Sequence, residues 1–196
     1  MFLLVGLGNP GREYESTRHN AGFEALDVLA RAADATAFRE KFSGEYATGS
    51  LAGESVVLLR PLTYMNLSGQ CVQPAAAFFK VPPARVVVLH DELDVPLGEL
   101  RAKVGGGHAG HNGLRDIQAK FGTPDFARVR IGIGRPGPGF KGTVADFVLA
   151  RFDAYERGQL DAALAKVQSV VEAFLAGNAG KAATLANAVK PGARLA

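Results

Sequence analysis

A histidine and an aspartate are the residues of this sequence best placed to do chemistry. His19 follows the polar, charged segment 12–18 and directly precedes a predicted helix, so its side chain can enter a cleft. Asp91 ends the most strand-like run of the chain, where α/β sheets present ligand-facing groups. A His–Asp pair at that place would form a general base that activates water, with a pKa near neutrality. The alternative interpretation of His19 is an ordinary surface histidine.

Three asparagines, Asn9, Asn66 and Asn112, each lie in a predicted turn or at the start of a predicted helix. The commonest use of asparagine at such positions is helix capping. An amide can also donate to a carbonyl or an oxyanion while accepting from an N–H, which suits a peptide-like substrate. Both interpretations stay open on sequence alone.

The segment Gly6–Gly11 matches G-x-G-x-x-G after a predicted strand, a pattern associated with dinucleotide binding. That pattern requires a helix to open at once, yet Pro10 lacks an N–H and residues 12–16 show no apolar period. The sequence therefore favours a loop that lets the backbone and Asn9 approach a ligand, with an ordinary tight turn as the alternative.

Other site classes are less well supported. His108 and His111 with Asp91 could suggest a metal site, but the glycines between 105 and 110 break the helix that such spacing needs. A serine nucleophile is disfavoured because no G-x-S-x-G occurs. His90, next to a buried strand, is predicted to be structural, although sequence alone does not exclude a catalytic role.

Charge separates along the chain. The 196 residues include 22 Lys+Arg and 19 Asp+Glu, a net charge of +3. Between Arg101 and Lys141, eight basic residues face two acidic ones, a balance of +6 that leaves −3 elsewhere. Such a separation predicts a polyanionic partner, and the alternative is a solvated basic face.

Hydrophobic periodicity predicts strands and helices in alternation, hence one α/β domain with a mixed, twisted sheet flanked by helices. Asn20 is a predicted N-cap, and Pro74 should kink its helix or shift the helix start. The predicted elements are strands at 2–6, 45–50, 55–60, 85–90, 99–104 and 127–134, helices at 21–33, 66–80 and 111–121, a loop at 134–142, one long helix from Asp153 to about Gly177, and a tail at 178–196.

The expected compartment is the cytoplasm. Cys71 has no partner cysteine, which fits a reducing environment. The first residues reach Gly8-Asn9-Pro10 too soon for a signal peptide, and no apolar run is long enough to span a membrane.

Six motifs follow one another in order along the chain. They are Val5-Gly-Leu-Gly-Asn-Pro-Gly, Tyr14-Glu-Ser-Thr-Arg-His-Asn-Ala-Gly, Pro61-Leu-Thr-Tyr-Met-Asn-Leu-Ser-Gly, His90-Asp-Glu-Leu-Asp, Gly105-Gly-Gly-His-Ala-Gly-His-Asn-Gly-Leu and Arg130-Ile-Gly-Ile-Gly-Arg-Pro. Together they closely resemble the motifs of bacterial peptidyl-tRNA hydrolases, and the resemblance covers about residues 2 to 147. The resemblance implies a phosphorylase/hydrolase-like fold and a monomeric, cytoplasmic enzyme that needs no metal or other cofactor. Its implied reaction is hydrolysis of peptidyl-tRNA dropped by the ribosome, which recycles the tRNA.

The resemblance also implies roles for individual residues. His19 would activate water against the ester, Asp91 would hold and polarise it, and Asn9 would sense the blocked amino group or help the oxyanion. The residues implied to bind the end of the substrate are Tyr14, Tyr64, Met65, Asn66, His111 and Asn112. Lys103 and Arg130 are implied to hold the tRNA 5′-phosphate, and we add Arg101 of the same basic segment to these phosphate-binding residues.

A non-catalytic RNA-binding module is the rival interpretation. It would need the basic segment but neither His19 nor Asp91. Such modules usually carry a platform of stacking aromatic residues, whereas Phe and Tyr in this sequence fall mostly at core periodicity. The sequence therefore favours an enzyme.

Overall fold

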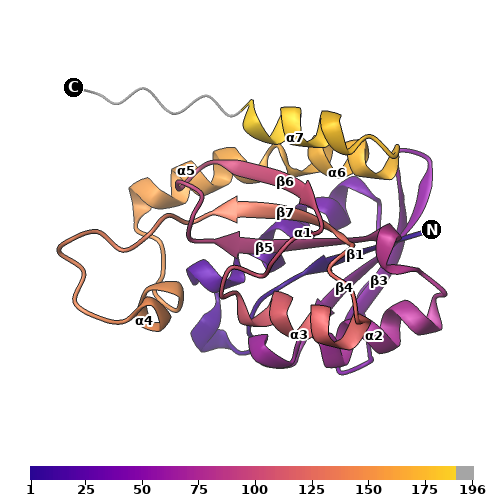
Figure 1. The fold of residues 1–196 in the computed structure, drawn as a ribbon, viewed down its shortest axis with the longest axis horizontal. Coiled ribbons are helices and arrows are strands. Elements are labelled where there is room, and N and C mark those ends of the chain that lie inside the picture. Colours follow the sequence, from indigo (N-terminus) through magenta and orange to yellow (C-terminus); the bar gives the residue numbers. More distant parts are fainter. Residues whose placement is uncertain (189–196) are drawn as a thin grey trace.

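A seven-stranded mixed sheet forms the centre of the molecule (Figure 1). The structure is a computed structural model that describes residues 1–188. The strands are β1 (Phe2–Gly6), β2 (Arg39–Lys41), β3 (Gly44–Leu51), β4 (Glu54–Pro61), β5 (Val86–Glu92), β6 (Leu100–Val104) and β7 (Ala127–Gly132). Their order in the sheet is β2-β3-β4-β1-β5-β7-β6. The four central strands are parallel, and the β3–β4 pair is antiparallel as predicted.

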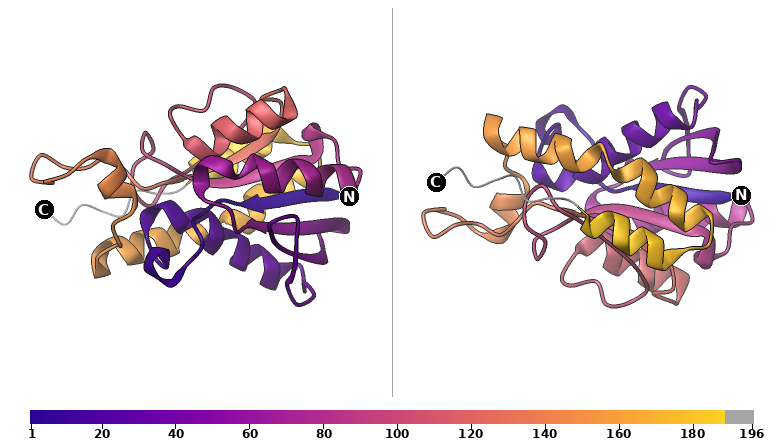
Figure 2. Two further views of the ribbon diagram at one scale, coloured as in Figure 1. Left: turned by 90° about the horizontal axis from the view of Figure 1, so that it is seen from below. Right: turned by 90° about the horizontal axis from the view of Figure 1, so that it is seen from above.

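Helices cover both faces of the sheet, so the core has two layers. One layer contains α1 (Ala21–Ala32), α5 (Ala154–Leu164), α6 (Val167–Leu175) and α7 (Ala179–Asn187), and the other contains α2 (Gly69–Phe78) and α3 (Asn112–Phe121). Figure 2 shows α1 on the opposite side of the sheet from α2 and α3. Because both faces are covered, every residue of β5 is buried, as its continuous apolar run predicts.

Several helix predictions need correction. The single long helix predicted after Asp153 is two helices, α5 and α6, separated at Ala165–Lys166. The predicted tail begins with α7, which Asn178 caps and whose Ala182 and Ala186 pack into the core. The remainder of that tail, 189–196, lies outside the described residues.

The helix predicted from residue 66 begins at Gly69, after a 3-10 turn over Met65–Leu67, and Pro74 lies inside it. This outcome matches the shifted start that Pro74 led us to expect. Two short elements were not predicted, namely the exposed strand β2 and the five-residue helix α4 (Val144–Val148). The loop predicted at 134–142 contains neither helix nor strand.

Within residues 1–188, no helix combines the length and the apolar character that a membrane span requires.

Candidate active site

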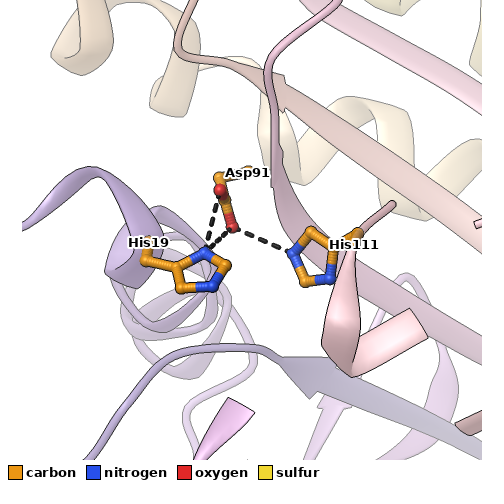
Figure 3. Close-up of side chains that lie close together, drawn as sticks. All are labelled: His19, Asp91 and His111. Atoms are coloured by element: carbon orange, nitrogen blue, oxygen red, sulfur yellow. Dashed lines mark hydrogen bonds and ion pairs between the residues drawn. The ribbon is translucent and has the colours of Figure 1, made fainter. Parts of the chain in front are cut away.

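Residues from four separate segments meet where the central parallel strands end. Asn9 follows β1, His19 lies in a 3-10 turn (Arg18–Asn20) before α1, Asp91 is on β5, and His111 directly precedes α3. All four line one cavity of about 720 Å³. Figure 3 shows His19 and His111 approaching the Asp91 carboxylate from opposite sides. The position agrees with the general rule that α/β sheets bind ligands beyond the carboxyl ends of their strands.

The Asp91 carboxylate binds both imidazoles. His19 Nδ1 lies 2.9 and 3.0 Å from the two Asp91 oxygens, and His111 Nε2 lies 3.0 Å from Oδ1. His111 Nδ1 accepts from the backbone N–H of Leu114 at 3.3 Å, so the His111 proton is on Nε2 and is donated to Asp91. His19 likewise donates from Nδ1. Its Nε2 is therefore the ring nitrogen left to accept a proton.

Electrostatics keep this pair in the charge states that a general base requires. Burial raises the pKa of the Asp91 carboxyl, but the charges and hydrogen bonds of His19 and His111 outweigh burial and hold that pKa well below its usual range. Burial lowers the pKa of the His19 imidazole, but the charge and hydrogen bond of Asp91 outweigh it, so the pKa lies above the usual 6.5. Asp91 is thus ionised at neutral pH, and His19 is a base that titrates above 6.5.

Asn9 presents a hydrogen-bond donor to the cavity. Its side-chain oxygen accepts from the backbone N–H of Met65 at 2.8 Å, which leaves the two amide N–H groups of Nδ2 for a ligand. The Asn9 backbone is braced by Asn20, whose side chain accepts from the Asn9 N–H at 2.8 Å and donates to the Asn9 carbonyl at 3.0 Å. Asn20 occupies the N-cap position of α1, as predicted, but its side chain makes no capping hydrogen bond and holds the glycine-rich loop instead.

Most of the predicted substrate-end residues line the same cavity. They are Tyr64, Met65, Asn66, His111 and Asn112. Tyr14 is not among the lining residues. No side chain of the three candidate asparagines caps a helix in residues 1–188, and the cap of α3 is His111. The capping interpretation of Asn9, Asn66 and Asn112 is thereby removed.

The predicted phosphate-binding residues form a patch on one face of β6 and β7. Arg101 pairs in register with Arg130, and Lys103 pairs with Arg128, so the four side chains share that face. Arg128 is buried and donates to the carbonyls of Gly106 and Gly107, which makes it a structural residue. Arg101 pairs with the Glu99 carboxylate at 2.7 Å.

Lys103 and Arg130 are positive charges of this patch that act on one another. Partial burial and the charges of Arg130 and Arg128 lower the pKa of Lys103, so these cations repel one another and an anion would relieve that repulsion. Arg130 donates from Nε to Glu92 at 3.0 Å, and Glu92 lines the cavity. The patch and the cavity are therefore adjacent.

Sequence reasoning missed one wall of the cavity. That wall is α4 and the residue after it, where Val144, Ala145, Val148 and Leu149 line the cavity. Val144 and Leu149 are 47% and 42% exposed, so apolar surface faces the open space. Five helical residues are too few for a periodic signal, although the Thr143–Asp146 capping box was visible as T-x-x-D.

His90 is structural, as predicted. It is fully buried, donates from Nδ1 to the Asp91 carbonyl at 2.7 Å, and packs edge-on against His111. Burial and the charge of His111 hold the pKa of His90 well below 6.5, so it remains neutral.

The metal-binding trio considered from sequence is not assembled, because His108 binds the Gly110 N–H instead. The ligand atoms that do come within 4.8 Å of one another belong to His19, Asp91 and His111. A cation bound between them would displace the hydrogen bonds that both imidazoles make to Asp91. This donor set fits a hydrogen-bonded base better than a metal centre.

An α/β fold with a carboxylate-held histidine that lines a cavity has the groups that a hydrolase needs to activate water. The family profile described as peptidyl-tRNA hydrolase matches residues 3–193. A peptidyl-tRNA hydrolase of Sorangium cellulosum is 60% identical over 173 residues, 88% of this chain and 78% of that protein. One of Neisseria meningitidis is 50% identical over 182 residues, 92% of this chain and 93% of that protein. The chain therefore belongs to the peptidyl-tRNA hydrolase family.

A solved structure supports the same assignment. The crystal structure of the peptidyl-tRNA hydrolase from Acinetobacter baumannii matches with a TM-score of 0.90 at 43% identity, and the match covers 98% of this chain and 97% of that chain. The expected α/β fold class is thereby confirmed.

Proposed function

We propose that this chain hydrolyses the ester bond of peptidyl-tRNA, releasing peptide and free tRNA and so recycling tRNA from peptides dropped by the ribosome. The observation that carries the proposal is the His19–Asp91 pair. Asp91 binds Nδ1 of His19, so Nε2 is left to accept a proton, and His19 lines the same cavity as Asn9. Family membership supplies the substrate class.

In this mechanism His19 Nε2 takes a proton from a water molecule, and the water oxygen attacks the ester carbonyl carbon. Asn9 Nδ2 donates to the carbonyl oxygen as it becomes an oxyanion. When the tetrahedral intermediate collapses, the carbon–oxygen bond to the ribose breaks, and the His19 imidazolium returns the proton to the ribose oxygen. Asp91 stays ionised throughout and stabilises the imidazolium.

The substrate's 3′ end and peptide fit the remaining lining residues. Asn66 and Asn112 offer amides to the peptide backbone or the terminal nucleotide, while Tyr64 and Met65 offer apolar contact. We assign Tyr14 a lesser part, because it does not line the cavity. His111 acts through Asp91.

The acceptor stem would extend from the cavity toward the patch on β6 and β7. There Lys103 and Arg130 bind the 5′-phosphate, and Arg101 adds positive charge. The guanidinium of Arg130 is held through Nε by Glu92, and its two Nη groups can grip a phosphate bidentately.

We further propose that the chain acts as a monomer in the cytoplasm and uses no metal or other cofactor. A base made of His19 and Asp91 can activate water without a Lewis acid.

The direct test is incubation with N-acetyl-aminoacyl-tRNA beside unblocked aminoacyl-tRNA, with ester cleavage followed over time. We expect rapid release of tRNA from the blocked substrate and slow release from the unblocked one. Binding of both tRNAs without cleavage of either would favour the alternative, a non-catalytic RNA-binding module.

Asn9→Ala is expected to lower cleavage of the blocked substrate and to narrow its preference over the unblocked one. Losing the Nδ2 donor penalises the transition state by about 1–3 kcal/mol and leaves the base intact. The measurement is kcat/KM for both substrates. Asn9→Asp is the companion variant, because it keeps an acceptor for the Met65 N–H but removes the donor. A ratio of the two substrates that stays at the wild-type value would make Asn9 a plain loop residue.

Changing Lys103 or Arg130 to Ala is expected to weaken tRNA binding and raise KM, with little loss of kcat on a short ester substrate. A lysine or arginine that binds a phosphate releases roughly one condensed counterion from the nucleic acid, and this release favours binding. The alanine variant lacks that contribution. Binding by the wild type should fall when the 5′-phosphate is removed enzymatically, whereas the double variant should not respond to that removal.

Lys120→Ala is the control for this pair, since it removes an exposed positive charge elsewhere in the basic segment. It should keep its sensitivity to the 5′-phosphate. If the double variant and the wild type lose equal affinity on dephosphorylation, the patch is only a diffuse attractor for RNA.

A further inference from the structure

Arg18, the residue directly before His19, is a buried arginine that binds a distant part of the chain. Its side chain is 7% exposed. Nη1 donates to the Arg151 carbonyl at 2.7 Å, and Nη2 lies 2.7 and 2.6 Å from the two carboxylate oxygens of Glu156. The guanidinium carbon lies 4.4 Å from the ring centre of Phe147 and 5.1 Å from that of Phe152. None of these contacts is used in the proton transfer described above.

The partners of Arg18 all belong to α4, the connection after it, and the start of α5. Phe147 is the buried residue of α4, on the same five-residue helix that presents Val144 and Val148 to the cavity. A backbone hydrogen bond joins the same two segments, since the Arg18 N–H donates to the Ala150 carbonyl at 3.0 Å. Figure 1 shows α4 outside the layers of the sheet, near the carboxyl ends of the strands.

A helix of five residues has little stability of its own, so its position depends on these contacts. Its capping box fixes its start but joins Thr143 only to Asp146, within the same turn. Arg18 contacts both segments: its guanidinium lies over the rings of Phe147 in α4 and of Phe152 in the connection, and its Nη2 meets both carboxylate oxygens of Glu156 in α5. It therefore contributes to fixing α4 relative to the turn carrying His19.

We propose that Arg18 is a positioning residue that joins the apolar α4 wall to the turn carrying His19, so that a peptide chain seated on the wall sets its ester against the base. Arg18 does not line the cavity. Arg18 sets the distance between the α4 wall, where the peptide binds, and His19 Nε2. A displacement of about 1 Å at a reacting centre can cost 10²-fold in rate. The inference rests on the proposed function and deepens it by naming the residue that links peptide binding to catalysis.

The test compares two substrates on Arg18→Met. One is tRNA carrying N-acetyl-alanine, which is too short to cover the α4 wall, and the other is tRNA carrying an N-acetylated trileucine. We expect single-turnover cleavage of the trileucine substrate to slow about 10- to 100-fold and that of the short substrate to change by less than about threefold. Methionine keeps apolar bulk between Phe147 and Phe152 but loses every hydrogen bond of the guanidinium.

Two further variants keep the test decisive. Glu156→Gln retains one acceptor for Arg18 and should show the same selectivity to a smaller extent, even if Arg18→Met folds poorly. Arg157→Met is the matched control, because Arg157 bridges Glu24 and Asp161 without contacting α4 or the His19 turn, and it should treat both substrates as the wild type does. Urea unfolding of each variant measures the stability that is lost.

Equal slowing of both substrates by Arg18→Met and Glu156→Gln would overturn the inference and leave Arg18 a residue of general structural support. Unchanged cleavage of both would overturn it too. Failure of the proposed function looks different, since the wild-type protein would then cleave neither substrate.

Discussion

His19→Ala is expected to lower kcat on N-acetyl-aminoacyl-tRNA by about 10²–10⁴-fold while leaving tRNA affinity almost intact. In the proposed mechanism the imidazole only moves a proton, and the contacts that hold the tRNA come from other residues. Removing the ring also does not unpair Asp91, which keeps its hydrogen bond from His111 at 3.0 Å. Single-turnover rates at saturating enzyme, together with tRNA binding by the inactive variant, measure the two effects separately.

His108→Ala is the matched control for this variant. His108 lies outside the cavity lining, and its side chain accepts a hydrogen bond from the Gly110 N–H, so loss of the imidazole should leave kcat near the wild-type value. Activity of His19→Ala within a few-fold of the wild type would remove His19 from the role of base.

Asp91→Asn is expected to lower kcat by about 10²–10⁴-fold and also to change its dependence on pH. The carboxylate raises the pKa of His19, and His19 must be neutral to accept a proton. In the wild type, the rate therefore rises as the pH passes a value above 6.5. An uncharged amide no longer raises the pKa of His19. The rise of kcat with pH should therefore occur at a lower pH in the variant, and the maximal kcat should be lower.

The amide of Asp91→Asn also replaces Oδ2, which lies 3.0 Å from His19 Nδ1, with an NH2 group that cannot accept from that N–H. A profile of kcat against pH from 5 to 9 tests the shift. The double variant with His19→Ala should be little worse than His19→Ala alone, since the two residues act as one unit. Free-energy losses that simply add would mean that the residues work independently.

The amino-acid sequence determined the elements that carry the site. The continuous apolar run of β5 requires burial on both faces, and burial places Asp91 at the end of a central strand. The helical spacing at 21–33 and 111–121 likewise puts His19 directly before one helix and His111 at the start of another. Periodicity records which face of an element is buried, and that information is local.

Tertiary structure alone decided how these residues are joined. His19 and Asp91 are 72 positions apart, and the hydrogen bond between them depends on the packing of the elements that carry them. The same holds for Asn20, whose short side chain suits a cap equally well but binds the Asn9 backbone once the two loops meet. The positions of α4 and α7 could likewise not be predicted from the sequence. A five-residue helix has no measurable period, and the alanines of α7 become core residues only when β6 lies beneath them.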